Sequence, residues 1–118
     1  MKGDKRFTKR ERILKPGEFR ELYEEGTRCS VGEFLLFVRP ANEGPLRAGF
    51  AVSSKLGSAT TRNRIKRYLR EIVRTHKGDL KRGLRVVIVA RPGANQLTFA
   101  QCREKILELF RKGNVIGG

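Results

Sequence analysis

The chain has 118 residues, the size of one domain that can bury a real core. Its 27 Lys and Arg residues against 12 Asp and Glu residues give a formal charge of +15, a surplus that indicates a polyanionic partner such as RNA, DNA or an acidic membrane. No apolar run reaches the roughly 18 to 20 residues that span a bilayer, and the N-terminus lacks the apolar core of a secretory signal. We therefore expect one domain over residues 1–118 and a soluble, cytoplasmic protein.

Cysteine and histidine are too few for a zinc site. Cys29 and Cys102 are far apart and form no CxxC motif, and His76 is the only histidine, so a zinc finger or ribbon cannot be assembled. Each cysteine lies in an apolar-patterned segment, which favours a small buried side chain over a redox role. We expect no disulfide and no metal ion bound by the protein.

Residues 1–15 are basic and sparsely apolar, and we expect this segment to be loosely ordered without a partner. A helix is predicted from Pro16 to a stop at Gly26, because proline suits the first helical position and Phe19 and Tyr23 are four residues apart on one side. Core packing is the simplest role for these two aromatic side chains.

Three strand patterns follow this helix. A short strand is predicted within residues 27–31, a second within 33–40 and a third within 46–53. A turn separates the second pattern from the third, so we expect these two strands to pair as a hairpin. Both faces of the second strand are apolar, and Leu35 and Phe37 are therefore either covered or form an exposed patch that a ligand can use.

The stretch from residue 53 to 76 combines an apolar series with a high basic charge. A helix that begins near Ala59 separates the two, with about 100° between successive residues. The apolar side consists of Thr61, Ile65, Tyr68, Leu69, Ile72 and Val73. The opposite side consists of Asn63, Arg67, Arg70 and Arg74. We expect no group in the helix to neutralise these guanidinium groups, whose planar shape suits phosphate oxygens.

The end of the chain predicts one more strand and one more helix. The strand lies within residues 84–92 and is apolar on both faces, as expected of an inner strand. The helix begins at Thr98, which has capping-box spacing to Gln101, and ends at Gly113. The order of helix, two or three strands, helix, strand and helix predicts an α+β fold, a two-layer α/β sandwich with helices packed on a sheet.

Few residues suit RNA cleavage by the protein itself. A two-metal nuclease needs clustered carboxylates, but Asp4 and Asp79 lie in predicted termini or loops and most glutamates lie on helix surfaces. General acid-base cleavage normally uses histidine, and His76 is predicted to be a packed or helix-terminal residue. No P-loop or dinucleotide-binding glycine motif is present. We expect no catalytic residue in the protein.

Nucleic-acid binding is indicated more strongly. A Lys-x-Gly turn at residues 55–57 precedes Arg62, Asn63 and Arg64, which lie in the first turns of the basic helix. The free N–H groups and the helix dipole favour phosphate at this end.

A resemblance to a known family is carried by the segment KLGSATTRNRIKRYLREIVR. This segment resembles the signature of the bacterial ribonuclease P protein subunit, in which an RNRxKR box heads the central helix. Nearly the whole chain follows the family's order, from the basic start RFTKRERILKPGEFRELYEEG through EFLLFV, RAGFAVSSKLG and LRVVIVARPGA to LTFAQCREKILELF. The resemblance implies a ribosomal protein S5 domain 2-like fold, α-β-β-β-α-β-α, with a left-handed crossover around the central helix, whereas general rules favour a right-handed one.

The resemblance also implies a function. Such proteins are cofactors of a catalytic RNA, which removes the 5′ leader of precursor tRNA by Mg²⁺-dependent hydrolysis. It implies that Mg²⁺ is bound mainly by the RNA subunit, that the protein alone is inactive and monomeric, and that it binds the RNA in a 1:1 ratio. The implied partners are RNase P RNA and precursor tRNA, with no membrane or DNA partner.

Two groups of residues match the family's binding positions. The residues implied to contact the RNA subunit are Arg62, Asn63, Arg64, Lys66, Arg67 and Arg70. Those implied to bind the leader, in a cleft between the first helix and the sheet, are Arg12, Phe19, Tyr23, Phe37 and Lys55. The family often has Phe at the position of Tyr23 and Tyr at that of Phe37, so the exchange here puts a hydrogen bond from a strand tyrosine in doubt.

Two other functions remain open. A ribosomal or RNA-chaperone type RNA-binding protein would have no role in cleavage and would bind without regard to a leader. A stand-alone nuclease would need the carboxylate cluster that the sequence lacks.

Overall fold

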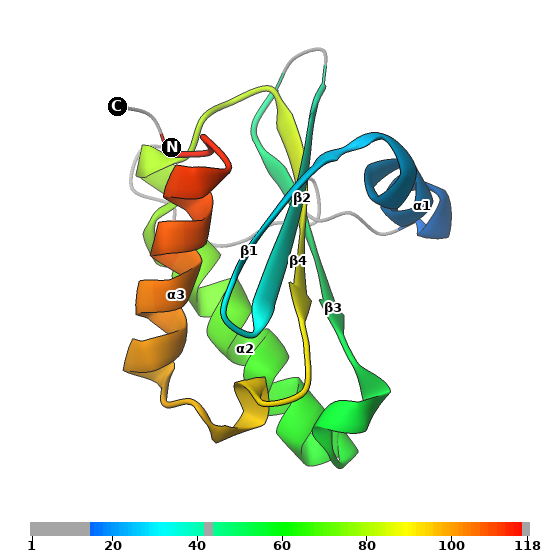
Figure 1. Cartoon of the computed structure of the whole chain (residues 1–118). Helices are drawn as coiled ribbons and strands as arrows, with labels where there is room; N and C mark the ends of the chain where they lie inside the picture. Colours follow the sequence, from blue (N-terminus) through cyan, green and yellow to red (C-terminus); the bar gives the residue numbers. More distant parts are fainter. Residues whose placement is uncertain (1–14, 42–43, 117–118) are drawn as a thin grey trace.

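The computed structural model describes residues 15–41 and 44–116 (Figure 1). Arg12 and the basic segment before Lys15 lie outside the described residues. The helices and strands are, in chain order, α1 (Pro16–Glu25), β1 (Thr27–Val31), β2 (Phe34–Pro40), β3 (Arg47–Val52), α2 (Ala59–Thr75), β4 (Leu84–Ala90) and α3 (Phe99–Lys112). Short 3₁₀ helices occur at Ser54–Leu56, Lys77–Asp79 and Ala94–Gln96. The predicted α+β class is confirmed, and no helix in these ranges is long and apolar enough to cross a membrane.

The four strands form one sheet in the order β1-β2-β4-β3. β2 is antiparallel to β1 and β4, whereas β3 is parallel to β4. The predicted hairpin between β2 and β3 is therefore wrong, because β4 lies between them. β4 is apolar on both faces, and Val87 and Ile88 are both completely buried, because α1 lies over one face and α2 and α3 lie over the other.

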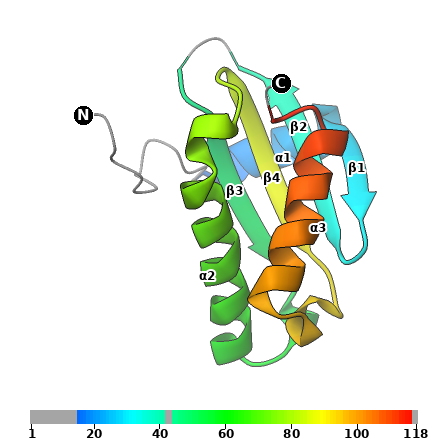
Figure 2. The same ribbon diagram turned by 90° about the vertical axis from the view of Figure 1, so that its left-hand side faces the viewer.

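α2 connects the parallel strands β3 and β4. In Figure 2, α2 lies in front of the sheet, β3 runs downward, α2 runs back upward and β4 lies to the right of β3. This arrangement is the left-handed crossover that the family resemblance implied, and not the right-handed one that general rules favour.

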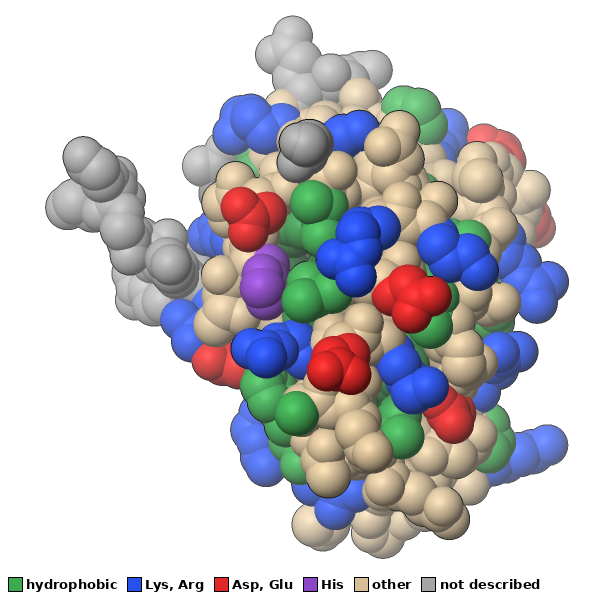
Figure 3. Space-filling model, turned by 60° about the vertical axis from the view of Figure 1, so that its left-hand side comes forward, with side chains coloured by type: hydrophobic (Ala, Val, Ile, Leu, Met, Phe, Trp, Pro, Cys, Tyr) green, Lys and Arg blue, Asp and Glu red, His purple; other side chains and the backbone are tan. Residues whose placement is uncertain are grey.

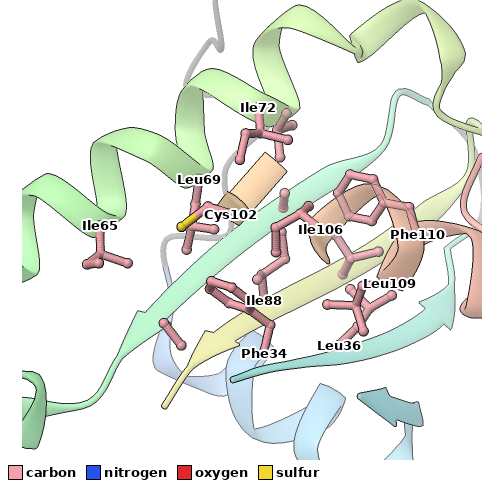
Figure 4. Packing of buried hydrophobic residues seen from close by; sticks show 14 of the residues in the cluster. Phe34, Leu36, Ile65, Leu69, Ile72, Ile88, Cys102, Ile106, Leu109 and Phe110 are labelled. Atoms are coloured by element: carbon pink, nitrogen blue, oxygen red, sulfur yellow. The ribbon is translucent and has the colours of Figure 1, made fainter. Parts of the chain in front are cut away.

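The main core lies between one face of the sheet and the helices α2 and α3. Figure 4 shows α2 and α3 side chains meeting strand side chains there. The residues labelled in it are Phe34, Leu36, Ile65, Leu69, Ile72, Ile88, Cys102, Ile106, Leu109 and Phe110. Ile65, Leu69 and Ile72 have no exposed surface, which confirms the predicted apolar side of the basic helix. Cys102 is likewise buried, as predicted.

Side chains at both helix starts fix where α2 and α3 begin. The Ser58 hydroxyl accepts a hydrogen bond from the Thr61 N–H at 3.3 Å. Thr98 and Gln101 form the predicted capping box, with bonds of 2.9 and 3.1 Å. His76 is the C-terminal cap of α2, in agreement with its predicted helix-terminal position.

α1 covers part of the other face of the sheet. A second, smaller cluster forms there around the buried side chains of Leu22 and Val87. The partly buried members of this cluster are Phe19, Phe37, Ala51 and Val89. Gly26 ends α1 and comes so close to β2 that an added Cβ would lie 3.1 Å from the Val38 carbonyl oxygen. The backbone at the end of α1 thus lies very close to the backbone of β2.

We predict opposite effects of two glycine substitutions in this region. Gly26→Ala should lower the free energy of unfolding by about 1 to 3 kcal/mol, because its Cβ would lie 2.6 Å from the Leu22 carbonyl oxygen. Gly17→Ala is the control within α1, where nothing lies within 4 Å of an added Cβ. It should raise the free energy of unfolding by about 0.5 to 1 kcal/mol. Urea unfolding followed by circular dichroism measures both, and equal shifts would contradict the close approach.

Candidate nucleic-acid interface

A short loop positions the first turn of the basic helix α2. The Ser53 hydroxyl accepts a hydrogen bond from the Lys55 N–H at 3.1 Å, which fixes the 3₁₀ helix that follows β3. Gly57 then has φ of +129°, a conformation that favours glycine. These local bonds set the direction in which α2 leaves the sheet.

The exposed side of α2 is basic over its first three turns. Asn63, Arg67 and Arg70 are exposed, and Arg62 and Lys66 are partly exposed. Arg62 folds back over the loop, where its Nε donates to the Gly57 carbonyl oxygen at 3.3 Å. The remaining guanidinium and ammonium groups of this side form a cationic surface along the helix.

Arg74 does not extend this cationic surface. Its Nε donates to the Glu71 carboxylate at 3.1 Å, and its Nη2 donates to the second carboxylate oxygen. The pair lowers the pKa of Glu71 and raises the pKa of Arg74. The expectation that nothing in the helix neutralises the arginines is therefore wrong for Arg74, because Glu71 lies three residues before it on the same side.

Arg64 is directed toward another part of the protein. Its Nη2 donates to the Asn95 carbonyl oxygen at 2.8 Å, in the 3₁₀ helix that follows β4. Its Nε is buried and has no hydrogen-bond partner in the described part of the chain. Arg64 consequently joins α2 to the loop before α3, a role that the sequence pattern did not reveal.

Three of the predicted leader-binding residues form one aromatic group. The ring of Tyr23 lies 5.1 Å from that of Phe37, at 75°, and 6.4 Å from that of Phe19. Tyr23 is 43% exposed, and burial of the rest raises the pKa of its phenol. The group joins α1 to the face of β2 that carries Phe37. This face was predicted to be either covered or open to a ligand, and α1 covers it only in part.

Lys55 lies outside the aromatic group, in the segment that joins β3 to α2. It is exposed in the 3₁₀ helix between β3 and α2, four residues after Ala51, which packs in the same cluster as Phe37. Along the chain, Lys55 therefore lies between the strand that carries Ala51 and the start of the basic helix.

Sequence reasoning missed a charged network beside the aromatic group. Three strand arginines, Arg39, Arg47 and Arg85, pair with carboxylates of α1. The strand alternation places Arg39 on the same face as Phe37, which is the one signal that the sequence offers for it.

The outer side of α2 and α3 has mixed charge. Figure 3, which brings this side of the molecule forward, shows acidic side chains interspersed with Lys and Arg. The acids of this layer are Glu71, Asp79, Glu104 and Glu108. Within residues 15–41 and 44–116, no three His, Cys, Asp or Glu side chains are grouped so that they could hold a metal ion.

The fold and these surfaces define a small basic α+β protein with a cationic helix on one face of its sheet and a partly exposed aromatic group on the other. The family model for ribonuclease P matches residues 7–114. The chain belongs to the ribonuclease P protein family, as the sequence resemblance predicted.

Relatives in sequence and in structure agree with this assignment. The ribonuclease P protein component of Geobacillus sp. is 35% identical over 109 residues, covering 92% of this chain and 94% of the relative. The RNase P protein of Thermotoga maritima has a TM-score of 0.80 at 31% identity, covering 92% of this chain and 99% of that one. A Staphylococcus aureus RNase P protein mutant with defective mRNA degradation activity has a TM-score of 0.85 at 29% identity, with 92% of each chain covered.

We predict that Arg64 and Arg67 differ in their effect on the stability of the protein without RNA. Arg64→Ala should lower the free energy of unfolding by about 1.5 to 3 kcal/mol, because it removes a charged donor from the Asn95 carbonyl. Arg67→Ala, at an exposed position, should change it by less than about 0.5 kcal/mol. Urea unfolding gives both values. Equal stabilities would mean that the bond to Asn95 contributes nothing to folding.

Proposed function

We propose that this chain is the protein subunit of ribonuclease P, which binds the catalytic RNA and the 5′ leader of precursor tRNA and assists removal of the leader. The observation that carries the proposal is the contact between Tyr23 and Phe37, in a chain of the ribonuclease P family. It leaves aromatic surface exposed on one face of the sheet, while Lys55 and the exposed side of the basic helix supply positive charge. Proteins that bind single-stranded RNA combine stacking rings with positive charge in this way.

The RNA subunit is proposed to bind along the cationic side of α2. Its phosphates would contact Arg62, Asn63, Lys66, Arg67 and Arg70. Arg64 contributes the part of its guanidinium group that is not bonded to Asn95. Support comes from the exposure of these groups and from the fit of guanidinium to phosphate oxygens.

The leader is proposed to stack on Phe19, Tyr23 and Phe37, while Lys55 neutralises its backbone. Arg12 is assigned the same electrostatic role from the family resemblance alone. The open stacking surface on Tyr23 supports this assignment, because a purely structural aromatic ring would be buried more completely.

Catalysis is proposed to belong to the RNA subunit with its Mg²⁺ ions. Among the described residues, no cluster of carboxylate side chains could hold the metal ions that a two-metal nuclease uses. The protein residues instead bind and position RNA, in a proposed 1:1 complex located in the cytoplasm.

The test of this function is cleavage of precursor tRNA in a reconstituted reaction. With bacterial ribonuclease P RNA, the protein should increase the cleavage rate at low Mg²⁺, because its positive charge replaces part of the cation requirement. The protein alone should leave precursor tRNA uncut. A second reaction should contain the protein alone with mRNA, since the Staphylococcus aureus protein of similar structure is a mutant with defective mRNA degradation activity. Cleavage by the protein alone in either reaction would favour the stand-alone nuclease.

Phe37→Ala and Arg67→Ala should separate the two binding surfaces. Phe37→Ala should weaken binding of leader-bearing precursor by about 1 to 3 kcal/mol and leave mature tRNA unaffected, because one stacking ring is lost. Arg67→Ala should weaken binding of the RNA subunit and reduce the slope of log K against log salt by about 0.7 to 0.9. Titrations at several salt concentrations measure both. Leader-independent binding by the unmodified protein would favour the ribosomal or RNA-chaperone alternative.

A further inference from the structure

A row of three arginines crosses the sheet beside the aromatic group. In the strand register, Arg39 of β2 lies opposite Arg85 of β4, which lies opposite Arg47 of β3. The next row on the same face contains Phe37 and Val87. Like charges that lie directly opposite each other in a sheet repel, so this row requires neighbouring anions.

α1 supplies three carboxylates to this row. Glu18 binds Arg47 through two hydrogen bonds of 2.6 and 3.2 Å. The other two carboxylates, Glu21 and Glu25, lie one and two turns along the same side of the helix. Glu21 lies 3.4 Å from Arg39 and 3.5 Å from Arg85, and Glu25 lies 3.2 Å from Arg39.

Glu21 has a central position in this network. It is the carboxylate that lies near both Arg39 and Arg85. The Nε atom of Arg85 is buried without a hydrogen-bond partner among the described residues, and Glu21 is the carboxylate that pairs with its guanidinium group. Loss of the Glu21 charge would leave the centre of the arginine row without its anion.

The ion pairs of α1 and its aromatic side chains lie on opposite flanks of the helix. The paired glutamates lie on one flank of the helix, Leu22 lies beneath it against Val87, and Phe19 and Tyr23 lie on the other flank. Leu22 is the only α1 residue among those described that is fully buried. Ion pairs along one flank therefore add a constraint on the rotation of α1 to the packing of Leu22 and Phe19 and the close approach at Gly26.

We propose that Glu18, Glu21 and Glu25 are positioning residues that clamp α1 at the rotation in which Tyr23 meets Phe37, so that leader affinity depends on carboxylates that do not touch RNA. This inference rests on the proposed leader-binding role of the aromatic group. It predicts a change in leader affinity that is opposite in sign to the change expected from charge alone. Removing a negative charge from an RNA-binding protein should by itself strengthen RNA binding, but removing a clamp carboxylate should weaken binding of the leader.

The test compares Glu21→Gln with Glu24→Gln in the reconstituted holoenzyme. Both substitutions raise the net charge by one and lie on α1, but Glu24 is exposed on the outer side of the helix, and no ion pair of Glu24 is found among the described residues. The measured quantity is the ratio of the affinities for leader-bearing precursor and mature tRNA. Glu21→Gln should reduce this ratio by about three- to tenfold, and Glu24→Gln should leave it unchanged. An increase for Glu21→Gln would overturn the clamp and indicate that the arginine row binds phosphate.

A measurement on the free protein separates the clamp from the proposed function. Proton NMR should show a nuclear Overhauser contact between the rings of Tyr23 and Phe37, weakened in Glu21→Gln and retained in Glu24→Gln. Unchanged signals from Ile65 and Leu109 would show that the main core remains folded. Glu25→Gln, which removes one contact with Arg39, should have a smaller effect in the same direction. Retention of the ring contact in Glu21→Gln would overturn the clamp, whereas the absence of leader discrimination in the unmodified protein would overturn the proposed function alone.

Discussion

The structure depends on the burial of β4 on both of its faces. Val87 points to α1 and Ile88 points to the layer of α2 and α3, and neither side chain has exposed surface. A strand of this kind has to lie inside the sheet and be covered on both sides. This requirement places β4 between β2 and β3 and brings α1 onto the second face. The aromatic group and the arginine row both lie on that second face, so both depend on the position of β4.

Local patterns in the sequence were sufficient to predict the helices and their buried sides. The apolar series of α2 and the capping box of α3 depend on residues within a few positions of one another, and both are present in the structure. Phe37 was singled out for the same reason, since strand alternation shows that both faces of β2 are apolar. Such features require no knowledge of which strand lies beside which.

Contacts between distant segments could not be predicted in the same way. The hairpin of β2 and β3 followed from their adjacency in the chain, but the tertiary structure inserts β4 between them. The bond from Arg64 to Asn95 joins residues 31 positions apart, and a helical wheel says nothing about a carbonyl in a later loop. The arginine row exists only in the observed register, because each member lies on a different strand.

The position of β4 also has a consequence for synthesis of the chain on the ribosome. β1 and β2 are joined by a tight connection and can pair as soon as both have emerged. The other edge of β2 has no partner until residues 84–90 have been made. β2 itself is apolar on both faces. An unpaired apolar edge is a template for association with other chains. Folding during translation therefore leaves β2 exposed while β3 and α2 are being made, and the surface proposed for the leader is completed only when β4 arrives.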